Sequence, residues 1–423
     1  MKSHVRDQLR VAISIYRDAI AKCADIEPNV RDLLTLRSRV KNEGLSFLTI
    51  TLPAFGNDFD RSLSLGQIGT LHFRSFKKCK GIPAFLQDIL CLVFDKRSGR
   101  LLDEPDISAI EGVRQITHAF KKLKVPCTQK RVDKALDSFL QVEHIFDEPL
   151  AECDNLLFQE VSHHLWGSVL SKSIDFWSDI YPKHGPGATA EKLAGNQKFT
   201  ATEWHDRLEP YFPVIDCKYA NANAVGCPGY EKVTIVNADQ ETPVRVIPVP
   251  KTLKKPRIIA IEPVCKQYAQ QAIARWLIEL LETSIYTKGH INFTDQSINR
   301  LLALDSSRTL KYATLDMSMA SDLVPYQGAL TMFRSNPDLM GAVDACRSTR
   351  CQMPDGKIYS IRKFASMGSA LCFPVEAMYF YTICVLALLQ ARNLPISSKN
   401  ILLVKDDIFV YGDDIIVPTN ESA

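Results

Sequence analysis

Residues 411–414 (Tyr-Gly-Asp-Asp) place two adjacent acids between two apolar runs near the end of this 423-residue chain. The flanking runs, 408–410 and 415–417, contain the β-branched and aromatic residues that favour strands. A Gly-Asp pair between two such runs is typical of a hairpin turn. The pattern therefore predicts a β-hairpin with the carboxylates of Asp413 and Asp414 at its tip. Such carboxylates are ligands for hard cations, although an ordinary surface turn uses the same residue types.

A second pair of acids, Asp316 and Asp322, lies upstream. Segment 309–314 has the composition of a short strand, and it leads directly to Asp316. If this strand lies beside the hairpin, its acid can share a metal ion with the hairpin tip. Phosphoryl transfer with two metal ions roughly 4 Å apart requires convergent carboxylates of this kind.

A loop rich in small residues, 364–370, lies between the two acidic segments. Small residues let the backbone approach a nucleotide closely, and serine hydroxyls can bond ribose or template groups. The same composition also fits an ordinary loop before a helix. The apolar stretch from Ala377 to Leu389 predicts a buried helix, because a membrane span needs roughly 20 apolar residues.

Residues 245–257 are strongly basic and contain no acid. Prolines 248, 250 and 256 disfavour a helix, so the segment is predicted as an extended arm. Arginine offers a fork suited to phosphate oxygens and lysine offers a point charge, so the arm is suited to a triphosphate. A solvated basic face is the alternative interpretation.

The order of these four elements is more specific than any one of them. In this order they resemble motifs F, A, B and C of the viral RNA-directed RNA polymerases. The strongest resemblance is to the replicase β subunit of the single-stranded RNA bacteriophages, the leviviruses. Three further phrases share it: 184–188 (His-Gly-Pro-Gly-Ala), 250–263 (from Pro-Lys-Thr to Ile-Glu-Pro) and 295–299 (Asp-Gln-Ser-Ile-Asn). The resemblance covers residues 180–420, roughly, and the first 180 residues match only in general character.

The resemblance implies catalytic roles for the acids. Asp316 and Asp413 would be the principal metal ligands, and Asp414 would be a supporting or second ligand. Asp322 would sense the ribose 2′-hydroxyl, the group that distinguishes RNA from DNA. The implied cofactors are two Mg²⁺ ions, for which Mn²⁺ can substitute.

The resemblance also implies nucleotide-binding residues. Ser366 and Gly368 would shape the pocket beneath the templating base pair. Lys251, Lys254 and Arg257 would neutralise the triphosphate and the charge that develops in the transition state. Ser369 and Ala370 stand where the family pattern has Asn-Gly.

The partners implied by the resemblance are an RNA template and product, ribonucleoside triphosphates, the host elongation factors Tu and Ts, and a ribosomal protein. The implied location is the cytoplasm of an infected bacterial host, without a membrane. In this family a further palm segment and a thumb normally follow the hairpin, so we expect the chain to be truncated.

The expected fold is α+β, a right-hand polymerase fold with fingers and palm, the thumb largely missing, and a mainly helical N-terminal region. Residues 1–180 would form that region and part of the fingers, 181–305 the fingers with the arm, and 306–423 the palm. Periodicity and turn composition predict the following helices (5–24, 30–40, 106–122, 129–142, 155–171 and 266–281), strands (232–236 and 244–249) and turns (53–56 and 81–83).

Bulk composition constrains function only weakly. Fifty-one basic residues against 48 acidic ones give a net charge of +3, so any RNA contact must use local patches. The 12 cysteines include no Cys-x-x-Cys pair, which favours reduced thiols over a zinc site.

Two alternatives remain open. A reverse transcriptase shares an aromatic-x-Asp-Asp hairpin, but it commonly has a bulky residue where Asp322 lies. A non-catalytic RNA-binding fragment of a replicase would bind RNA without turnover.

Overall fold

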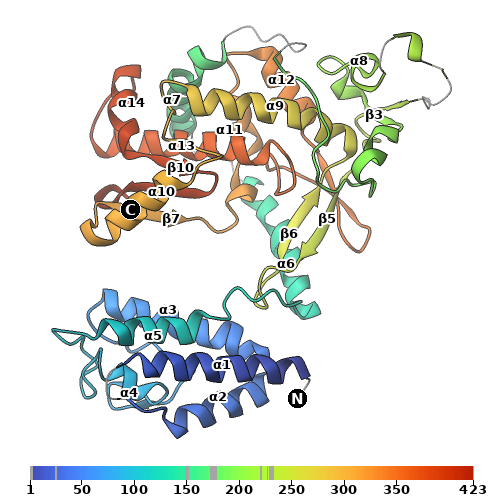
Figure 1. Ribbon diagram of the computed structural model, residues 1–423. Coiled ribbons are helices and arrows are strands. Elements are labelled where there is room, and N and C mark those ends of the chain that lie inside the picture. The colour runs from blue at the N-terminus through green and yellow to red at the C-terminus, as the bar shows by residue number, and fades with distance from the viewer. Residues whose placement is uncertain are drawn as a thin grey trace. The chain divides into compact units, whose positions relative to one another are not determined.

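The computed structural model describes residues 3–23, 26–147, 152–171, 179–219, 222–225, 227 and 233–422, and it mixes helices with small sheets (Figure 1). It divides into two compact units. The first unit is Met1–Leu136 with Pro248–Arg257, and the second is Asp137–Ile247 with Ile258–Ala423. The mixed content agrees with the expected α+β class. The boundaries of these two units differ from those of the three predicted ranges, 1–180, 181–305 and 306–423. The assignment of those ranges to N-terminal region, fingers and palm stays a prediction.

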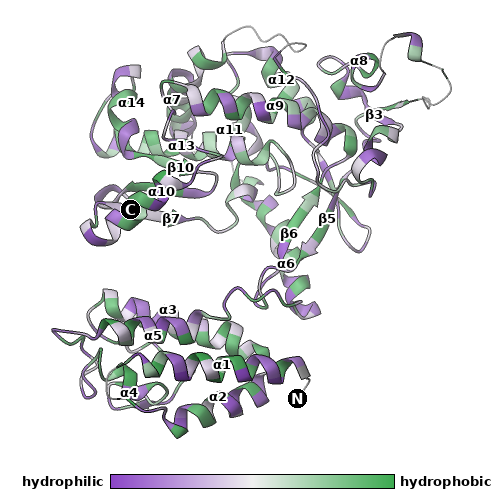
Figure 2. Ribbon diagram, in the orientation of Figure 1, coloured by the Kyte–Doolittle hydropathy of each residue, from purple (hydrophilic) through white to green (hydrophobic). Residues whose placement is uncertain are grey.

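The first unit is mainly helical. Apolar and polar residues are mixed along each of its helices, as expected for helices that bury one face and expose the other (Figure 2). Phe55 lies at its centre, with ring centroids 4.5 Å from Phe73 and 4.9 Å from Phe76. The elements are α1 (Ser3–Ala21), α2 (Val30–Glu43), α3 (Leu52–Ser64), β1 (Lys78–Cys79), β2 (Ile82–Pro83), α4 (Gln87–Leu90), α5 (Ile107–His118) and most of α6 (Gln129–Gln141).

The predicted turn at 53–56 is wrong, because these residues lie inside α3. Pro53 lies in the first turn of the helix, where no backbone N–H is required. A Cβ on Gly56 would lie 2.5 Å from Thr117 Oγ1 and His118 Nε2, so the glycine allows α3 and α5 to approach closely. The predicted turn near 81–83 is partly confirmed, since Gly81 lies in the turn of the β1–β2 hairpin.

The second unit contains three small sheets and the longest helices. In one sheet the strand order is β6 (Arg257–Ile261), β5 (Val244–Val249), β8 (Arg350–Gln352) and β9 (Ile358–Ser360). In another, β3 (Glu203–His205) pairs in parallel with β4 (Thr234–Val236). The third consists of β10 (Phe409–Tyr411), β11 (Asp414–Pro418) and β7 (Tyr312–Asp316). The helices are α7 (Glu152–Leu170), α8 (Val214–Lys218), α9 (Val264–Thr283), α10 (Ser297–Thr309), α11 (Tyr326–Thr331), α12 (Pro337–Cys346), α13 (Cys372–Ala391) and α14 (Ser398–Val404).

Each helix and strand predicted from the sequence is present in one unit or the other. Their ends differ from the predicted ones by a few residues. Two predicted ends, Ala24 and Lys232, lie outside the described residues.

Helix α13 is the central element of the second unit's core. It runs from Cys372 to Ala391, so it is longer than the predicted 377–389, and the length argument against a membrane span was wrong. Among the described helices it alone is long and apolar enough to span a membrane, but 72% of that stretch is buried inside the protein. Trp166 of α7 donates a 3.0 Å hydrogen bond to Thr382, and Tyr381 donates a 2.7 Å bond to the Tyr286 carbonyl. These contacts confirm the predicted buried helix.

Candidate active site

The predicted hairpin is confirmed. Strands β10 and β11 are antiparallel, and the pairing of Tyr411 with Asp414 leaves a two-residue turn, Gly412 and Asp413. Gly412 has φ +64°, while Asp413 is not among the residues with positive φ, a combination that fits a type II′ turn with glycine first. A Cβ on Gly412 would lie 2.0 Å from Phe373 Cε2. Both the turn and its packing against the start of α13 therefore require glycine.

Strand β7 lies beside the hairpin, as the sequence predicts. It begins at Tyr312, because Thr309 belongs to α10, and it pairs antiparallel with β11. In this register Asp316 lies directly opposite Asp414. Opposite residues of an antiparallel pair project from the same face, with Cβ atoms about 4.5–5.5 Å apart. Burial and the charges of Asp413 and Asp316 raise the pKa of Asp414. The three acids are therefore electrostatic neighbours.

A cavity of about 340 Å³ lies next to the paired acids. Asp316 and Asp414 form part of its wall. Gln296, which precedes α10, and Asn299 and Arg300 in its first turn form another part. Helix α10 packs along β7 (Figure 1). Asn299, the last residue of the family-like phrase 295–299, thus lines the same cavity as the acids. Arg300, which carries a guanidinium, lines it as well.

Glu376 of α13 is an acid in this region that the sequence analysis did not assign. Its side chain is buried, and burial raises its pKa to about 7 against the lowering effect of a hydrogen bond from Ser321. The charges of Asp413 and Asp322 raise this pKa further. In the sequence, the sign that could have pointed to Glu376 is that it is a single acid within an otherwise apolar stretch, 372–391.

Asp322 forms an ion pair with Lys363, also unassigned from the sequence. Lys363 Nζ lies 3.1 Å from Asp322 Oδ1 and 3.1 Å from Glu143 Oε1. It also lies 3.5 Å from the ring centroid of Phe139, and the lysine side chain is fully buried. Because an uncompensated buried ammonium is costly, the two carboxylates and the ring fix this position. No local pattern in the sequence distinguished this lysine from those on the surface.

The loop 364–370 packs against strand β6. The amide of Ala260 donates a 2.9 Å hydrogen bond to the Met367 carbonyl, and Gly368 has φ +133°. A Cβ on Gly368 would lie 2.0 Å from the Ala260 carbonyl oxygen, so only glycine fits. Ser366 is buried beside a cavity of only about 10 Å³, roughly the minimum for one water. Its hydroxyl therefore does not face a space of nucleotide size in this structure.

The basic arm contains no helix, as predicted. Residues 245–249 lie in strand β5, and residues 248–257 belong to the first unit. Lys251, Lys254 and Arg257 are exposed, whereas Leu253 is buried in the core of that unit. Arg131 donates a 2.8 Å hydrogen bond to the Leu253 carbonyl. The three predicted phosphate-binding cations thus flank an anchored apolar residue, and the acids belong to the other unit.

Within the described residues, no group of three or more His, Cys, Asp or Glu side chains is arranged to hold a metal ion. The acids present are nevertheless hard oxygen donors, and their mutual repulsion at Asp414 is of the kind that a cation relieves. The donor chemistry fits a divalent cation in which a pair of carboxylates is completed by other ligands.

Comparison with known protein families identifies the family to which this segment belongs. Residues 207–423, which contain all of these acids, the loop and the arm, match the family described as RNA replicase, beta-chain. The chain belongs to the RNA replicase beta-chain family. The expected resemblance is thus confirmed.

The chain is similar to polymerase subunits of phages. It is 33% identical over 239 residues to the RNA-directed RNA polymerase subunit beta of Qbeta virus (strain MX1), covering 56% of this chain and 36% of that protein. The corresponding protein of Enterobacteria phage SP is 32% identical over 42% of this chain and 28% of its own length. The beta chain of Escherichia phage MS2 is 30% identical over 41% and 28%. The chain thus spans about a third of the length of these relatives.

A solved structure, the RNA-dependent RNA polymerase from bacteriophage phi12, aligns with 88% of this chain and 59% of its own chain. The sequence identity is 13% and the TM-score is 0.35.

Proposed function

We propose that this chain carries out RNA-directed RNA synthesis, adding ribonucleotides to an RNA 3′ end on an RNA template. The observation that carries the proposal is the register that sets Asp316 opposite Asp414, with Asp413 in the adjoining turn, inside a segment that matches the replicase family. Family membership favours this function over reverse transcription.

The proposed architecture follows from this assignment. The sheet of β7, β10 and β11 with α13 behind it is the palm, which corresponds to residues 306–423. Residues 181–305 are the fingers, with the basic arm at 245–257. Residues 1–180 are the mainly helical N-terminal region and contribute to the fingers.

Asp316 and Asp413 are the proposed principal metal ligands, and Asp414 is the supporting one. Magnesium commonly binds one or two protein carboxylates and completes its coordination with substrate phosphates, so a pair of acids suffices. Two such ions, when bound, would activate the primer 3′-hydroxyl and stabilise the leaving pyrophosphate. The chain's own residues contribute the negative charge that draws the cations to the hairpin tip.

Asp322 is the proposed sensor of the ribose 2′-hydroxyl. Its ion pair with buried Lys363 holds one carboxylate oxygen, leaving the second oxygen to accept from a hydroxyl. The side chain retains 18% exposure, which gives a ligand access to it.

The remaining proposed contacts concern the nucleotide. Lys251, Lys254 and Arg257, exposed on the arm, neutralise the triphosphate. Gly368 holds the loop close to β6, and Ser366 supports the same loop beneath the templating base pair.

The proposed partners follow from the family resemblance alone. They are an RNA template, ribonucleoside triphosphates, the elongation factors Tu and Ts of the host and a ribosomal protein. The proposed place of action is the cytoplasm of an infected bacterium.

The function is tested with the 423-residue chain, a primed RNA template, Mg²⁺ and the four ribonucleoside triphosphates. We expect extension that Asp413→Asn and Asp316→Asn abolish, whereas Asp406→Asn, an exposed acid paired with His290, leaves it intact. Extension that survives Asp413→Asn would remove the metal assignment, and a preference for deoxynucleotides would revive reverse transcription.

A second measurement separates metal binding from turnover. Water-proton relaxation of Mn²⁺ reports binding of the ion directly. We expect Asp316→Asn and Asp414→Asn to weaken this binding and Asp406→Asn to leave it unchanged. Template RNA that binds without extension, in a protein that holds Mn²⁺ normally, would support the non-catalytic RNA-binding alternative.

A further inference from the structure

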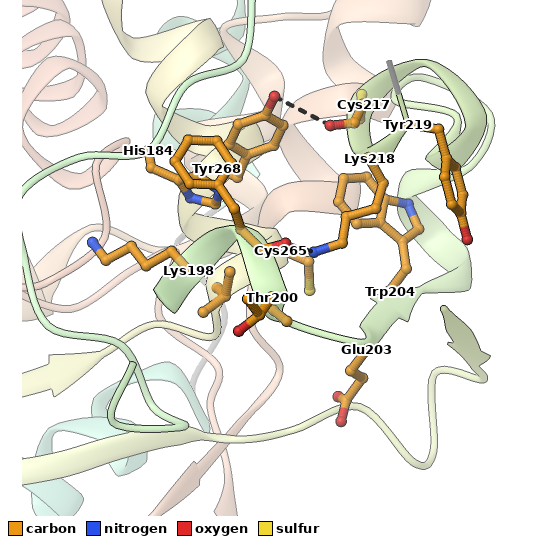
Figure 3. Close-up of a pocket in the computed structure, with 13 residues that line it drawn as sticks. His184, Lys198, Thr200, Glu203, Trp204, Cys217, Lys218, Tyr219, Cys265 and Tyr268 are labelled. Carbon is orange, nitrogen blue, oxygen red and sulfur yellow. Dashed lines mark hydrogen bonds between the residues drawn. The ribbon is translucent and has the colours of Figure 1, made fainter. Parts of the chain in front are cut away.

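A cavity of about 530 Å³ in the second unit lies outside the acidic site described above (Figure 3). None of the proposed metal ligands lines it. Its volume falls within the range of about 300–1,000 Å³ that is usual for small-molecule pockets. The walls include five flat rings, contributed by His184, Phe199, Trp204, Tyr219 and Tyr268.

The ring of His184 is fixed by two of these neighbours. Its centroid lies 4.5 Å from that of Tyr268 and 4.6 Å from that of Phe199, which meets it edge-on. Burial and the positive charges of Lys198 and Lys218 lower the pKa of His184 to about 4. The imidazole is therefore neutral at pH 7, and its buried Nδ1 has no hydrogen-bond partner within the described residues.

Trp204 supplies a second polar atom without a partner. The residue is only 3% exposed, and its indole Nε1 makes no hydrogen bond within the described residues. Buried tryptophan normally finds an acceptor for this N–H, because an unmade hydrogen bond is costly away from water. Because Trp204 lines the cavity, its N–H is a donor without an acceptor in the described part of the pocket wall.

Other polar groups of the pocket already have partners. Lys198 is buried and donates to the carbonyls of Gly185 and Gly187, which holds the turn that carries His184. Glu203 accepts hydrogen bonds from Thr242, and Tyr268 donates a 3.3 Å bond to the Cys217 carbonyl, drawn as the dashed line in Figure 3. The pocket is therefore built before any ligand arrives.

The two cysteines of the pocket are not reactive groups. Burial raises the pKa of Cys217 to about 12, and it also raises the pKa of Cys265. Neutral thiols are poor nucleophiles and poor metal ligands, so the pocket has the chemistry of binding rather than of catalysis.

We propose that this pocket binds the base of an unpaired nucleotide. A base is flat and stacks on aromatic side chains, and its ring nitrogens and carbonyls accept from an indole N–H. Lys218, which donates to the Phe199 carbonyl, places an ammonium at the pocket, where a phosphate attached to the base is attracted. The inference rests on the proposed function for the presence of RNA and nucleotides.

The test measures AMP binding to the 423-residue chain by equilibrium dialysis, in EDTA so that metal-dependent sites are silent. Trp204→Phe keeps an aromatic ring and removes only the N–H. We expect it to weaken AMP binding about tenfold, the effect of one unmade hydrogen bond. Trp276→Phe is the matched control, because Trp276 lies further along α9 and is not among the residues that line the pocket, and it should bind AMP like the parent.

Two further binding experiments show whether the base comes from an RNA strand or a free nucleotide, and whether the base itself makes the contact. A single-stranded RNA hexamer that competes with AMP shows that the pocket accepts a base from a strand, and AMP binding without such competition assigns it to free nucleotides. Ribose 5-phosphate tests the base itself and should bind far more weakly than AMP. Equal binding of ribose 5-phosphate, full AMP affinity in Trp204→Phe, or no AMP binding to the parent would each overturn the proposal.

Failure of this proposal can be told apart from failure of the proposed function. Asp413→Asn should leave AMP binding in EDTA unchanged, and Trp204→Phe should leave Mn²⁺ binding unchanged. Each variant therefore reports on one site only.

Discussion

Asp316 at the end of β7 lies directly across the strand pair from Asp414 in β11, with Asp413 one residue away in the turn. Like charges directly opposite each other destabilise a strand pair. The charges of Asp316 and Asp413 accordingly raise the pKa of Asp414, after burial, which is the largest cause. The hairpin tip is thus an electrostatically unfavourable arrangement that is expected to become favourable when a cation binds.

Removing one of these charges should stabilise the metal-free protein. We expect Asp316→Asn to raise the free energy of unfolding in EDTA by about 0.5 kcal/mol, the usual size of such a cross-strand effect. The same variant should lose most of the stabilisation that Mg²⁺ gives the parent. Thermal denaturation with and without Mg²⁺ measures both effects. Equal stabilisation of parent and variant by Mg²⁺ would contradict the assignment of Asp316.

Lys363 should be far more important for stability than an exposed lysine. Lys363→Met leaves Glu143 and Asp322 without their shared cation, and losing one partner of a buried pair costs about 3–5 kcal/mol. The control is Lys357→Met, since Lys357 pairs with Asp355 on the surface and should cost less than about 1 kcal/mol. Urea denaturation compares the two variants. Similar losses in both would show that the ion pairs of Lys363 contribute little.

Discrimination between ribonucleotides and deoxyribonucleotides should also depend on Lys363, if Asp322 senses the sugar. Lys363→Arg keeps the charge but changes the reach and geometry of the donor. We expect it to lower the preference for ribonucleotides while leaving Mn²⁺ binding at the acids unchanged. An unaltered preference in a folded variant would separate Lys363 from sugar selection.

Glu376 should make the stability of the protein depend on pH. Its pKa is about 7 in the folded protein against 4.5 ordinarily, so between these values the folded state binds a proton that the unfolded state lacks. Stability therefore falls as pH rises from about 4.5 to 7, by on the order of 3 kcal/mol. Glu376→Gln should remove this fall, so that the variant gains on the parent as pH increases. The measurement is the free energy of unfolding of parent and variant in EDTA from pH 5 to 8. The same pH dependence in both proteins would contradict the raised pKa of Glu376.

Gly368 should tolerate no side chain, whereas Gly356 should tolerate one at moderate cost. Both have positive φ, but a Cβ on Gly356 would meet nothing within 4 Å, while one on Gly368 would strike the Ala260 carbonyl at 2.0 Å. Gly356→Ala should cost about 1 kcal/mol from backbone strain alone, and Gly368→Ala about 3 kcal/mol or more. Chemical denaturation of both variants tests the difference. Equal costs would show that the loop moves freely away from β6.

Local features of this structure could be predicted from the sequence. The hairpin follows from Gly412 and the apolar runs on either side, because turn geometry and strand preference act over a few residues. The extended arm follows from its prolines for the same reason. The turn expected at Pro53 was wrong because composition alone cannot distinguish a proline that begins a helix from one that ends it.

Features that depend on distant contacts could not be predicted. The register that sets Asp414, and not Asp413, opposite Asp316 depends on the pairing of strands far apart in the chain. Lys363 gains its importance from Glu143 and Asp322, which lie on other elements. The pKa of Glu376 is raised mainly by burial, and the sequence shows only that its neighbours along the chain are apolar.

The position of Leu253 has a consequence for how the N-terminal region and the basic arm evolve together. Leu253 is buried among the helices of the first unit, between exposed Lys251 and Lys254. The Cys127 thiol also donates to the adjacent Thr252 carbonyl. Substitutions within residues 1–136 that repack this core would therefore shift the two lysines without touching them. Sequence drift in the helical region is then restrained by the proposed phosphate contacts of these lysines as well as by folding.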